Sequence, residues 1–178
     1  MTKEIFVFDI DGCVMPPIIS NFVENGETRD ELIKNALKKG AEIHLYAEFV
    51  KYYEKHCKKA DSVLFITGRK KSEFGELTEI QLKSLKNARE FEIIYYPEEL
   101  HHTPDEYFEW KSNKIQKIVN GYIDKNNSMG KLTKKSTFNI FDDLNEYFPI
   151  LKKFFIKKGL KINLVLIEGE ESWKVFRQ

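Results

Sequence analysis

The chain has 178 residues, 42% hydrophobic and 32% charged, a balance that fits a single soluble domain over 1–178 with a buried core. Its 29 basic and 28 acidic residues give a formal net charge of +1, which excludes an overall field that would attract nucleic acid or an anionic membrane. Two cysteines are too few for a disulfide framework, and no apolar run approaches the roughly 18 residues of a membrane-spanning helix.

Five short apolar runs recur along the chain and are the predicted strands. They are Ile5–Phe8, Val63–Ile66, Phe91–Tyr96, Phe138–Phe141 and Ile162–Ile167. Runs that are short and rich in Ile, Val, Phe or Tyr suit strands buried on both faces of a parallel sheet. The first run is also shorter than the apolar core of a signal peptide, roughly 7–15 residues, so we expect a cytoplasmic protein.

Helical patterns fill the segments between these runs. A capping box at Thr28 and Glu31 opens a helix that Gly40 ends. Apolar residues at helical spacing predict further helices at 46–53, 77–88, 110–119 and 144–158, with Pro149 near the start of the last. His101 to Glu109 and Asp124 to Lys135 are predicted polar loops. Strand and helix thus alternate, which predicts a three-layer α/β fold with a mostly parallel sheet.

Two acidic residues follow the first predicted strand directly. Asp9 and Asp11 stand at positions i and i+2, and Gly12 begins a loop. In an open α/β sheet, ligands bind beyond the carboxyl ends of the strands. Two carboxylates there repel each other unless a cation binds or one is protonated. Both states serve phosphoryl transfer, in which one carboxylate attacks phosphorus and the other exchanges a proton. Alone, the pair fits two solvated acids in a turn equally well.

A second acidic pair, Asp142-Asp143, follows the strand predicted at Phe138–Phe141. By themselves these two acids would simply cap the next helix. Together with Asp9 and Asp11 they make four hard oxygen ligands at two strand ends. Such a set suits Mg²⁺ in contact with a phosphate.

The strand predicted at Val63–Ile66 continues into Thr67 and Gly68. The Thr67 hydroxyl and the backbone N–H groups near Gly68 offer hydrogen bonds to phosphoryl oxygens, although a plain strand-to-loop turn has the same pattern. Lys111 and, one turn later, Lys114 are two candidates for a cation that neutralises the phosphate and the acids. Because lysines are mostly solvated surface charges, the choice between them stays open.

Four of these segments, in this order, resemble the motifs of the haloacid dehalogenase (HAD) superfamily. Asp9-Ile10-Asp11-Gly12 is similar to motif one, Phe65–Arg69 to motif two, Lys111 to the motif-three lysine and Asp142-Asp143 to the paired-acid form of motif four. The resemblance spans nearly the whole chain. It implies a Rossmann-like sheet of five parallel strands in the order 3-2-1-4-5 with helices on both faces. In that order strands one and four are neighbours that flank the ligand-binding switch point.

The same resemblance implies a magnesium-dependent phosphatase that cleaves phosphomonoesters. Asp9 would be the nucleophile that forms an aspartyl-phosphate, and Asp11 would be the acid and base. Thr67 and Lys111 would hold the phosphoryl oxygens.

The resemblance also implies the metal ligands and the substrate contacts. Mg²⁺ would be bound by Asp9, Asp11 (through its carbonyl), Asp142 and Asp143. Gly12, Gly68 and Arg69 would line the substrate-binding site. One departure is Cys13, which stands where the family usually has Thr or Val, and which we interpret as a small packed side chain.

Family members often carry a cap domain that selects small substrates. Here the segment 15–39 leaves room only for a small flap or helical insert. We therefore expect no full cap domain and an open site. An open site suits a macromolecular phosphate ester, or a small substrate covered by an oligomer partner.

Two other functions stay open. A nucleic-acid end-processing phosphatase would need a basic, aromatic groove beside the site, which Arg69, Lys70, Lys71 and His101-His102 would have to furnish. The near-neutral net charge disfavours it. A HAD-like binding module without activity would have lost an acid, yet every expected acid is present.

Overall fold

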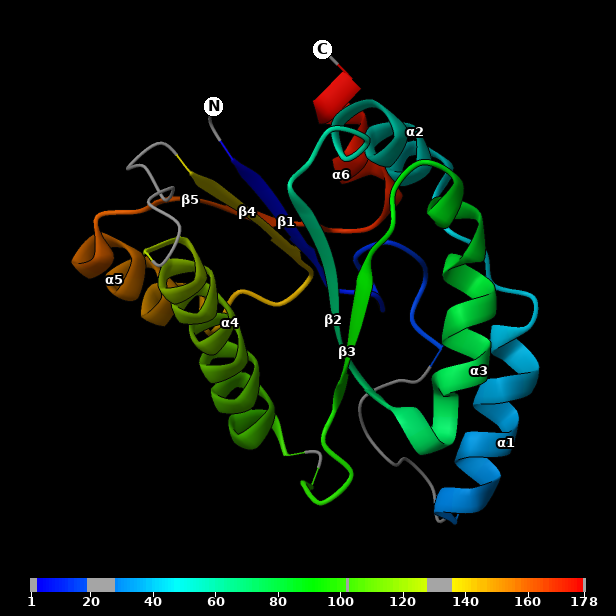
Figure 1. Ribbon diagram of the computed structural model, residues 1–178. Helices are drawn as coiled ribbons and strands as arrows, with labels where there is room; N and C mark the ends of the chain where they lie inside the picture. The colour runs from blue at the N-terminus through cyan, green and yellow to red at the C-terminus, as the bar shows by residue number, and fades with distance from the viewer. Residues whose placement is uncertain (1–2, 19–27, 102, 128–135, 178) are drawn as a thin grey trace.

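The computed structural model describes residues 3–18, 28–101, 103–127 and 136–177 of the chain. Five parallel strands form one sheet in the order β3-β2-β1-β4-β5 (Figure 1). The strands are β1 Glu4–Phe8, β2 Ser62–Lys70, β3 Glu92–Tyr96, β4 Thr137–Asp142 and β5 Lys161–Leu166. The structure therefore confirms the predicted Rossmann-like α/β fold and its strand order.

Helices cover both faces of this sheet (Figure 1). They are α1 Arg29–Gly40, α2 Ala47–His56, α3 Lys71–Leu82, α4 Pro104–Asn127, α5 Phe148–Lys158 and α6 Glu170–Lys174, with 3-10 turns at Lys83–Asn87 and Val175–Arg177. Helices α4 and α5 pack on one face, and α2, α3 and α6 pack on the other. Helix α1 lies outside α3, against Phe74.

Successive side chains of β1 point to opposite faces of the sheet and pack into two separate cores. Phe6 and Phe8 belong to the core under α2 and α6, whereas Ile5 and Val7 belong to the core under α4 and α5. All four side chains are buried. This is why the strand reads as a continuous apolar run rather than as an alternating one.

Helix α4 begins at Pro104, within the segment predicted as a polar loop, so that prediction is wrong from Pro104 to Glu109. The Thr103 hydroxyl accepts a hydrogen bond from the Glu106 backbone N–H (3.4 Å), and proline is well suited to a first helical turn. The α4 backbone also continues to Asn127, so the predicted loop is wrong from Asp124 to Asn127, and residues 128–135 lie outside the described residues. In the described part of the chain, no helix is both long and apolar enough to cross a membrane.

Helix α5 begins at Phe148 rather than at Leu144. Pro149 consequently falls in the first turn, where its missing N–H has no intrahelical partner to lose. Gly159 ends the helix in the left-handed conformation, with φ of 64°.

The segment predicted as a flap, 15–39, contributes one helix in its described part. The capping box predicted at Thr28 and Glu31 is present, and α1 ends at Gly40 as expected. Residues 19–27 of this segment lie outside the described residues. The absence of a full cap and the open site therefore stay predictions.

Candidate functional site

The site is built where β1 and β4 end side by side. Phe8 pairs with Phe141 in the parallel register, and the Asp9 backbone N–H donates to the Phe141 carbonyl at 2.9 Å. Asp9 and Asp142 therefore emerge from neighbouring strands at the same edge of the sheet. This is the switch point at which an open α/β sheet binds its ligands.

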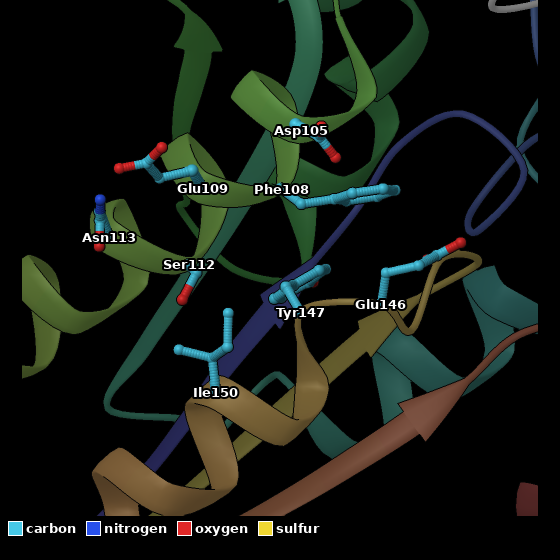
Figure 2. A pocket seen from close by; sticks show the side chains of 8 residues that line it. All are labelled: Asp105, Phe108, Glu109, Ser112, Asn113, Glu146, Tyr147 and Ile150. Carbon is cyan, nitrogen blue, oxygen red and sulfur yellow. The ribbon is translucent and has the colours of Figure 1, made fainter.

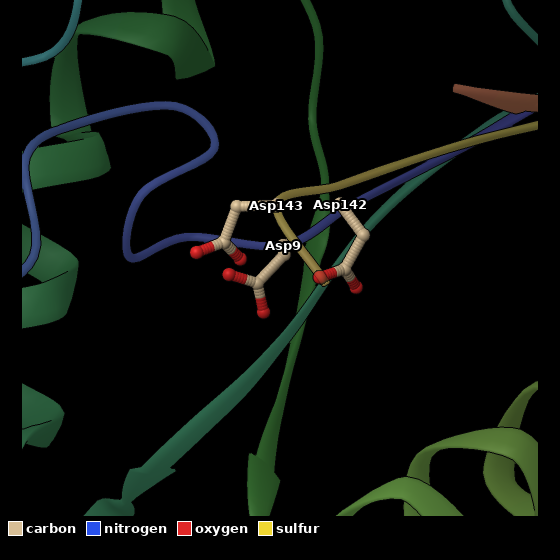
Figure 3. A group of neighbouring side chains, drawn as sticks. All are labelled: Asp9, Asp142 and Asp143. Atoms are coloured by element: carbon tan, nitrogen blue, oxygen red, sulfur yellow. The ribbon is translucent and has the colours of Figure 1, made fainter. Parts of the chain in front are cut away.

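Three acidic side chains converge at this edge (Figure 3). Asp9, Asp142 and Asp143 each offer a carboxylate oxygen, and these atoms all lie within 4.8 Å of one another. Asp9 is 5% exposed and Asp142 is 1% exposed. Buried carboxylates this close need a cation, which makes the group a possible metal-binding cluster.

Lys111 of α4 supplies one positive charge to this cluster. Its Nζ lies 2.6 Å from Asp9 Oδ1 and 2.5 Å from Asp142 Oδ2, and the side chain is 1% exposed. Lys114, the competing candidate from the sequence, is half-buried and not part of this contact. The structure therefore places Lys111 at the site. With all three carboxylates ionised, the single ammonium leaves a net charge of about −2, which matches a divalent cation.

The pKa shifts follow from burial and from this crowding. Burial raises the pKa of Asp9; Lys111 opposes that shift, while Asp142 and Asp143 add to it. Burial alone would lower the pKa of Lys111, but the charges of Asp142 and Asp9 outweigh it and raise the pKa, so the ammonium keeps its proton. Burial, followed by the charge of Asp142, raises the pKa of Asp143 to about 7.

Asp142 is the most heavily hydrogen-bonded member of the cluster. Its Oδ2 accepts from the Tyr147 hydroxyl at 2.5 Å and from Lys111, and its Oδ1 accepts from the Leu144 backbone N–H at 3.0 Å. Burial raises the pKa of Tyr147, so its hydroxyl remains a donor. These donors hold Asp142 in one orientation beside Lys111.

Tyr107 is a second tyrosine at the site that the sequence analysis missed. Its hydroxyl accepts from Lys111 Nζ at 2.8 Å and donates to Asp9 Oδ1 at 3.4 Å. A Cβ on Gly68 would lie only 3.1 Å from the Tyr107 ring, so the glycine provides room for this contact. The sequence Thr103-Pro104-Asp105-Glu106 carries a helix-start signal, which would have placed Tyr107 one turn before Lys111 on the same helix face.

Asp11 lies apart from the acidic cluster, in an ion pair with Arg69. Arg69 Nε lies 2.7 Å from Asp11 Oδ2, and its Nη2 lies 2.8 Å from Asp11 Oδ1. The Ile18 backbone N–H also donates to Oδ1 at 3.2 Å. The site thus contains two differently paired acids, Asp9 with Lys111 and Asp11 with Arg69.

The segment from Thr67 to Arg69 leaves the regular pairing between β2 and β3. Ile66 pairs with Ile94, but Lys70 pairs with Tyr96, so three residues of β2 face one residue of β3. Such irregularities re-aim side chains, often beside active sites. Thr67 is buried, and its hydroxyl accepts from the Arg69 backbone N–H at 3.2 Å.

Gly12 keeps the loop after β1 close to Asp143. Its φ is +79°, a left-handed conformation that favours glycine. A Cβ at this position would lie 2.3 Å from Asp143 Oδ2. Because Gly12 has no side chain, the Asp143 carboxylate can occupy this space. That Gly12 also contacts substrate stays a prediction.

We expect Gly12→Ala to displace Asp143 as well as strain the loop. The left-handed backbone costs a non-glycine residue about 1–2 kcal/mol, and the steric clash adds to that. Gly159→Ala is a matched control, because its φ is also positive (64°) but its Cβ would have no neighbour within 4 Å. Chemical denaturation should show the larger loss for Gly12→Ala. Equal losses for the two variants would contradict the clash.

Cys13 belongs to the loop after β1 and packs into the core as a small side chain, as the sequence suggested. The thiol is fully buried, and burial and then the charge of Asp9 raise its pKa, so it stays protonated. The Cys13 carbonyl accepts from the Trp173 indole N–H of α6 at 2.8 Å. This bond ties the C-terminal helix to the loop that carries Asp11 and Gly12.

A pocket of about 410 Å³ adjoins the site between α4 and α5 (Figure 2). Tyr147, which holds Asp142, is one of its walls, and Phe108 is another. Its lining residues are Asp105, Phe108, Glu109, Ser112, Asn113, Glu146, Tyr147 and Ile150. Three of these are acidic and none is basic, so this side of the site repels anions.

Compared with models of known protein families the sequence matches none, and no curated protein sequence matches it.

Proposed function

We propose that this chain is a magnesium-dependent phosphohydrolase of the HAD superfamily, which cleaves phosphomonoesters through an aspartyl-phosphate on Asp9. The observation that carries this proposal is the arrangement around Asp9. This carboxylate lies at the end of β1, against Lys111, in a cluster with Asp142 and Asp143. A second acid, Asp11, stands two residues away with a separate partner.

In the first step an Asp9 carboxylate oxygen forms a bond to phosphorus, and the bond from phosphorus to the leaving oxygen breaks. Asp11 gives its proton to the leaving oxygen, so that an alcohol departs. Lys111 and Thr67 hold the phosphoryl oxygens. Lys111 suits this task because its ammonium keeps its proton in the buried site.

In the second step a water molecule attacks the phosphorus of the aspartyl-phosphate. Asp11, now a carboxylate, accepts the proton of that water. The bond between phosphorus and Asp9 breaks, inorganic phosphate leaves, and both acids return to their first state.

Asp9 and Asp143 are the carboxylates best placed to hold Mg²⁺, with the Asp11 carbonyl implied by the family resemblance. Asp142 already accepts from Tyr147, Lys111 and Leu144, so we assign it to holding Lys111 beside the carboxylates that would bind the metal. When bound, Mg²⁺ would neutralise the carboxylates and the phosphate charge.

Turnover of a panel of phosphate esters tests this function. The panel contains aryl and alkyl phosphates, sugar phosphates and 3′- or 5′-phosphorylated oligonucleotides, each with Mg²⁺ and with chelator. We expect release of inorganic phosphate only with the metal. A full panel without release at saturating Mg²⁺ would contradict the proposal.

We also expect the affinity for Mg²⁺ to rise with pH up to about 7. Metal must displace the proton of Asp143, whose pKa is raised to about 7. Without metal, the free energy of unfolding should change with pH in the opposite direction and fall as the pH rises. Because the folded pKa lies above the usual aspartate value of about 4, this group's contribution to stability is lost as pH rises from about 4 to about 7.

Calorimetric titration of Mg²⁺ between pH 5.5 and 8.5 measures the first effect, and thermal unfolding in chelator measures the second. Asp143→Asn is the matched variant, in which both pH dependences should weaken, with the raised pKa of Asp9 contributing what remains. An affinity that is constant across this range in the wild-type protein would count against Asp143 as a ligand.

The nucleic-acid alternative is less well supported by the described residues. The pocket beside the site carries three acids, Arg69 is paired with Asp11, and Lys70 Nζ donates to the Glu98 carbonyl. His102, part of the expected basic groove, lies outside the described residues. A small or uncharged leaving group fits this surface better than a polyanion.

The two buried free thiols, Cys13 and Cys57, suit the reducing cytoplasm in which we place the enzyme.

A further inference from the structure

Arg69 uses its whole guanidinium on protein partners. Nε and one N–H of Nη2 donate to Asp11, the other N–H of Nη2 faces Met15 Sδ at 3.5 Å, and Nη1 donates to Thr78 Oγ1 at 3.0 Å and Gln81 Oε1 at 2.7 Å. A guanidinium has five N–H donors, and all five have a partner here. The side chain is 2% exposed. Arg69 therefore has no donor left for a phosphate in this arrangement.

The partners of Arg69 are themselves fixed. The Thr78 hydroxyl donates to the Phe74 carbonyl at 2.8 Å, one turn earlier in α3. Gln81 Nε2 donates to the Gly40 carbonyl at 2.9 Å, where α1 ends. The guanidinium is thus held in place by α3 and, through Gln81, by the end of α1.

This anchoring limits what Asp11 can do. A carboxylate has about four lone-pair positions. Two accept from Arg69 and a third accepts from the Ile18 backbone N–H. One position, on Oδ2, remains for a proton. A bidentate pair with a rigid guanidinium also fixes the plane of the carboxylate, which a single hydrogen bond does not.

We propose that Arg69 is a positioning residue, anchored by Thr78 and Gln81, that orients the Asp11 carboxylate so that only its Oδ2 exchanges a proton with the leaving group and with water. This inference rests on the proposed phosphohydrolase function. It assigns Arg69 to the general acid, where the sequence analysis had expected it to contact substrate.

Leaving-group dependence tests the proposal. Esters with poor leaving groups, such as glycerol 2-phosphate, need protonation of the leaving oxygen, whereas p-nitrophenyl phosphate needs little. Loss of a general acid costs about 10²–10⁴-fold. We expect Arg69→Met to lose most of that factor in kcat for glycerol 2-phosphate, with a smaller loss for p-nitrophenyl phosphate and little change in KM.

Three further variants separate positioning from damage to the fold. Arg69→Lys keeps the positive charge but loses the planar pair of N–H donors that binds both carboxylate oxygens. Its kcat should therefore lie between those of the wild type and Arg69→Met. In an Asp11→Asn background, Arg69→Met should cause little further loss, because both changes remove one function. Arg89→Met removes an arginine that donates to the Asp61 carbonyl, just before β2, and should leave the leaving-group dependence unchanged.

Equal losses for both esters, or losses that multiply in the double variant, would overturn the proposal while leaving the phosphohydrolase function intact. Absence of turnover in the wild-type protein would instead contradict the function. In that case diffraction from Arg69→Met crystals still decides the positioning: we expect the Asp11 carboxylate to rotate or to adopt several orientations. An unchanged single orientation would refute it.

Discussion

Replacement of Asp9 by Asn should lower kcat for phosphate monoesters by roughly 10⁴–10⁶-fold, the scale seen when a covalent nucleophile is removed. Asparagine has nearly the same shape as aspartate, but its amide oxygen does not attack phosphorus. The fold should survive, because Lys111 keeps its contact with Asp142 and one of three crowded carboxylates loses its charge. Steady-state phosphate release and thermal unfolding of the same sample measure both effects.

Asp61→Asn is the matched control for this variant. Asp61 Oδ2 accepts from the Glu4 backbone N–H at 2.8 Å, at the opposite end of β1 from Asp9. Asp61→Asn should leave kcat equal to that of the wild type within experimental error. Substantial turnover in Asp9→Asn would show that another group attacks phosphorus, and the aspartyl-phosphate mechanism would have to be abandoned.

Lys111→Met should have the largest effect on stability. Removing one partner of a buried ion pair costs about 3–5 kcal/mol, because the other charge stays buried without compensation. Here two acids, Asp9 and Asp142, lose the same ammonium. We expect that loss in chemical denaturation with chelator at pH 8, and partial recovery with Mg²⁺, which supplies positive charge to the same carboxylates.

Lys114→Met provides the comparison, since this lysine is one turn further along α4 and is half-buried. Its free energy of unfolding should change by no more than about 0.5 kcal/mol, as for most surface substitutions. Similar small changes in both variants would mean that Lys111 does not neutralise the acids. Kinetics should agree, with a large fall in kcat for Lys111→Met only.

The fold could be predicted from the sequence because its signals are local. Runs such as Phe138–Phe141 are buried on both faces, and the residues that follow them are polar. Strand order came only from the family resemblance, since pairing depends on contacts between distant segments. The apolar spacing predicts the start of α4 too late, because its charged first turn resembles a loop, although Thr103 and Glu106 carry a capping signal.

The acids of the site could be predicted because they directly follow strand ends, whereas Lys111 was one of two candidate lysines and only the family resemblance favoured it. Asp9 and the pair Asp142-Asp143 were found because β1 and β4 place them at one edge. Tyr107 and Tyr147 were missed, because a tyrosine on an amphipathic helix has the pattern of an ordinary core residue.

The pairing of Asp11 with Arg69 joins residues 58 positions apart. It depends on how α3 packs, which no local pattern indicates. For the same reason the sequence could not show that the Arg69 donors are already occupied. Candidate residues next to a motif therefore need the packed structure before a substrate contact is assigned.

The most direct test of the proposed mechanism is a crystal structure of the protein with Mg²⁺ and beryllium fluoride, which mimics a phosphoryl group on a carboxylate. We expect fluoroberyllate density joined to one oxygen of Asp9, and an octahedral ion near Asp9 and Asp143 with oxygen distances of about 2.1 Å. Thr67 and Lys111 should contact the fluorines. Density on Asp11 instead, or an empty Asp9 at saturating metal and fluoride, would contradict the aspartyl-phosphate mechanism.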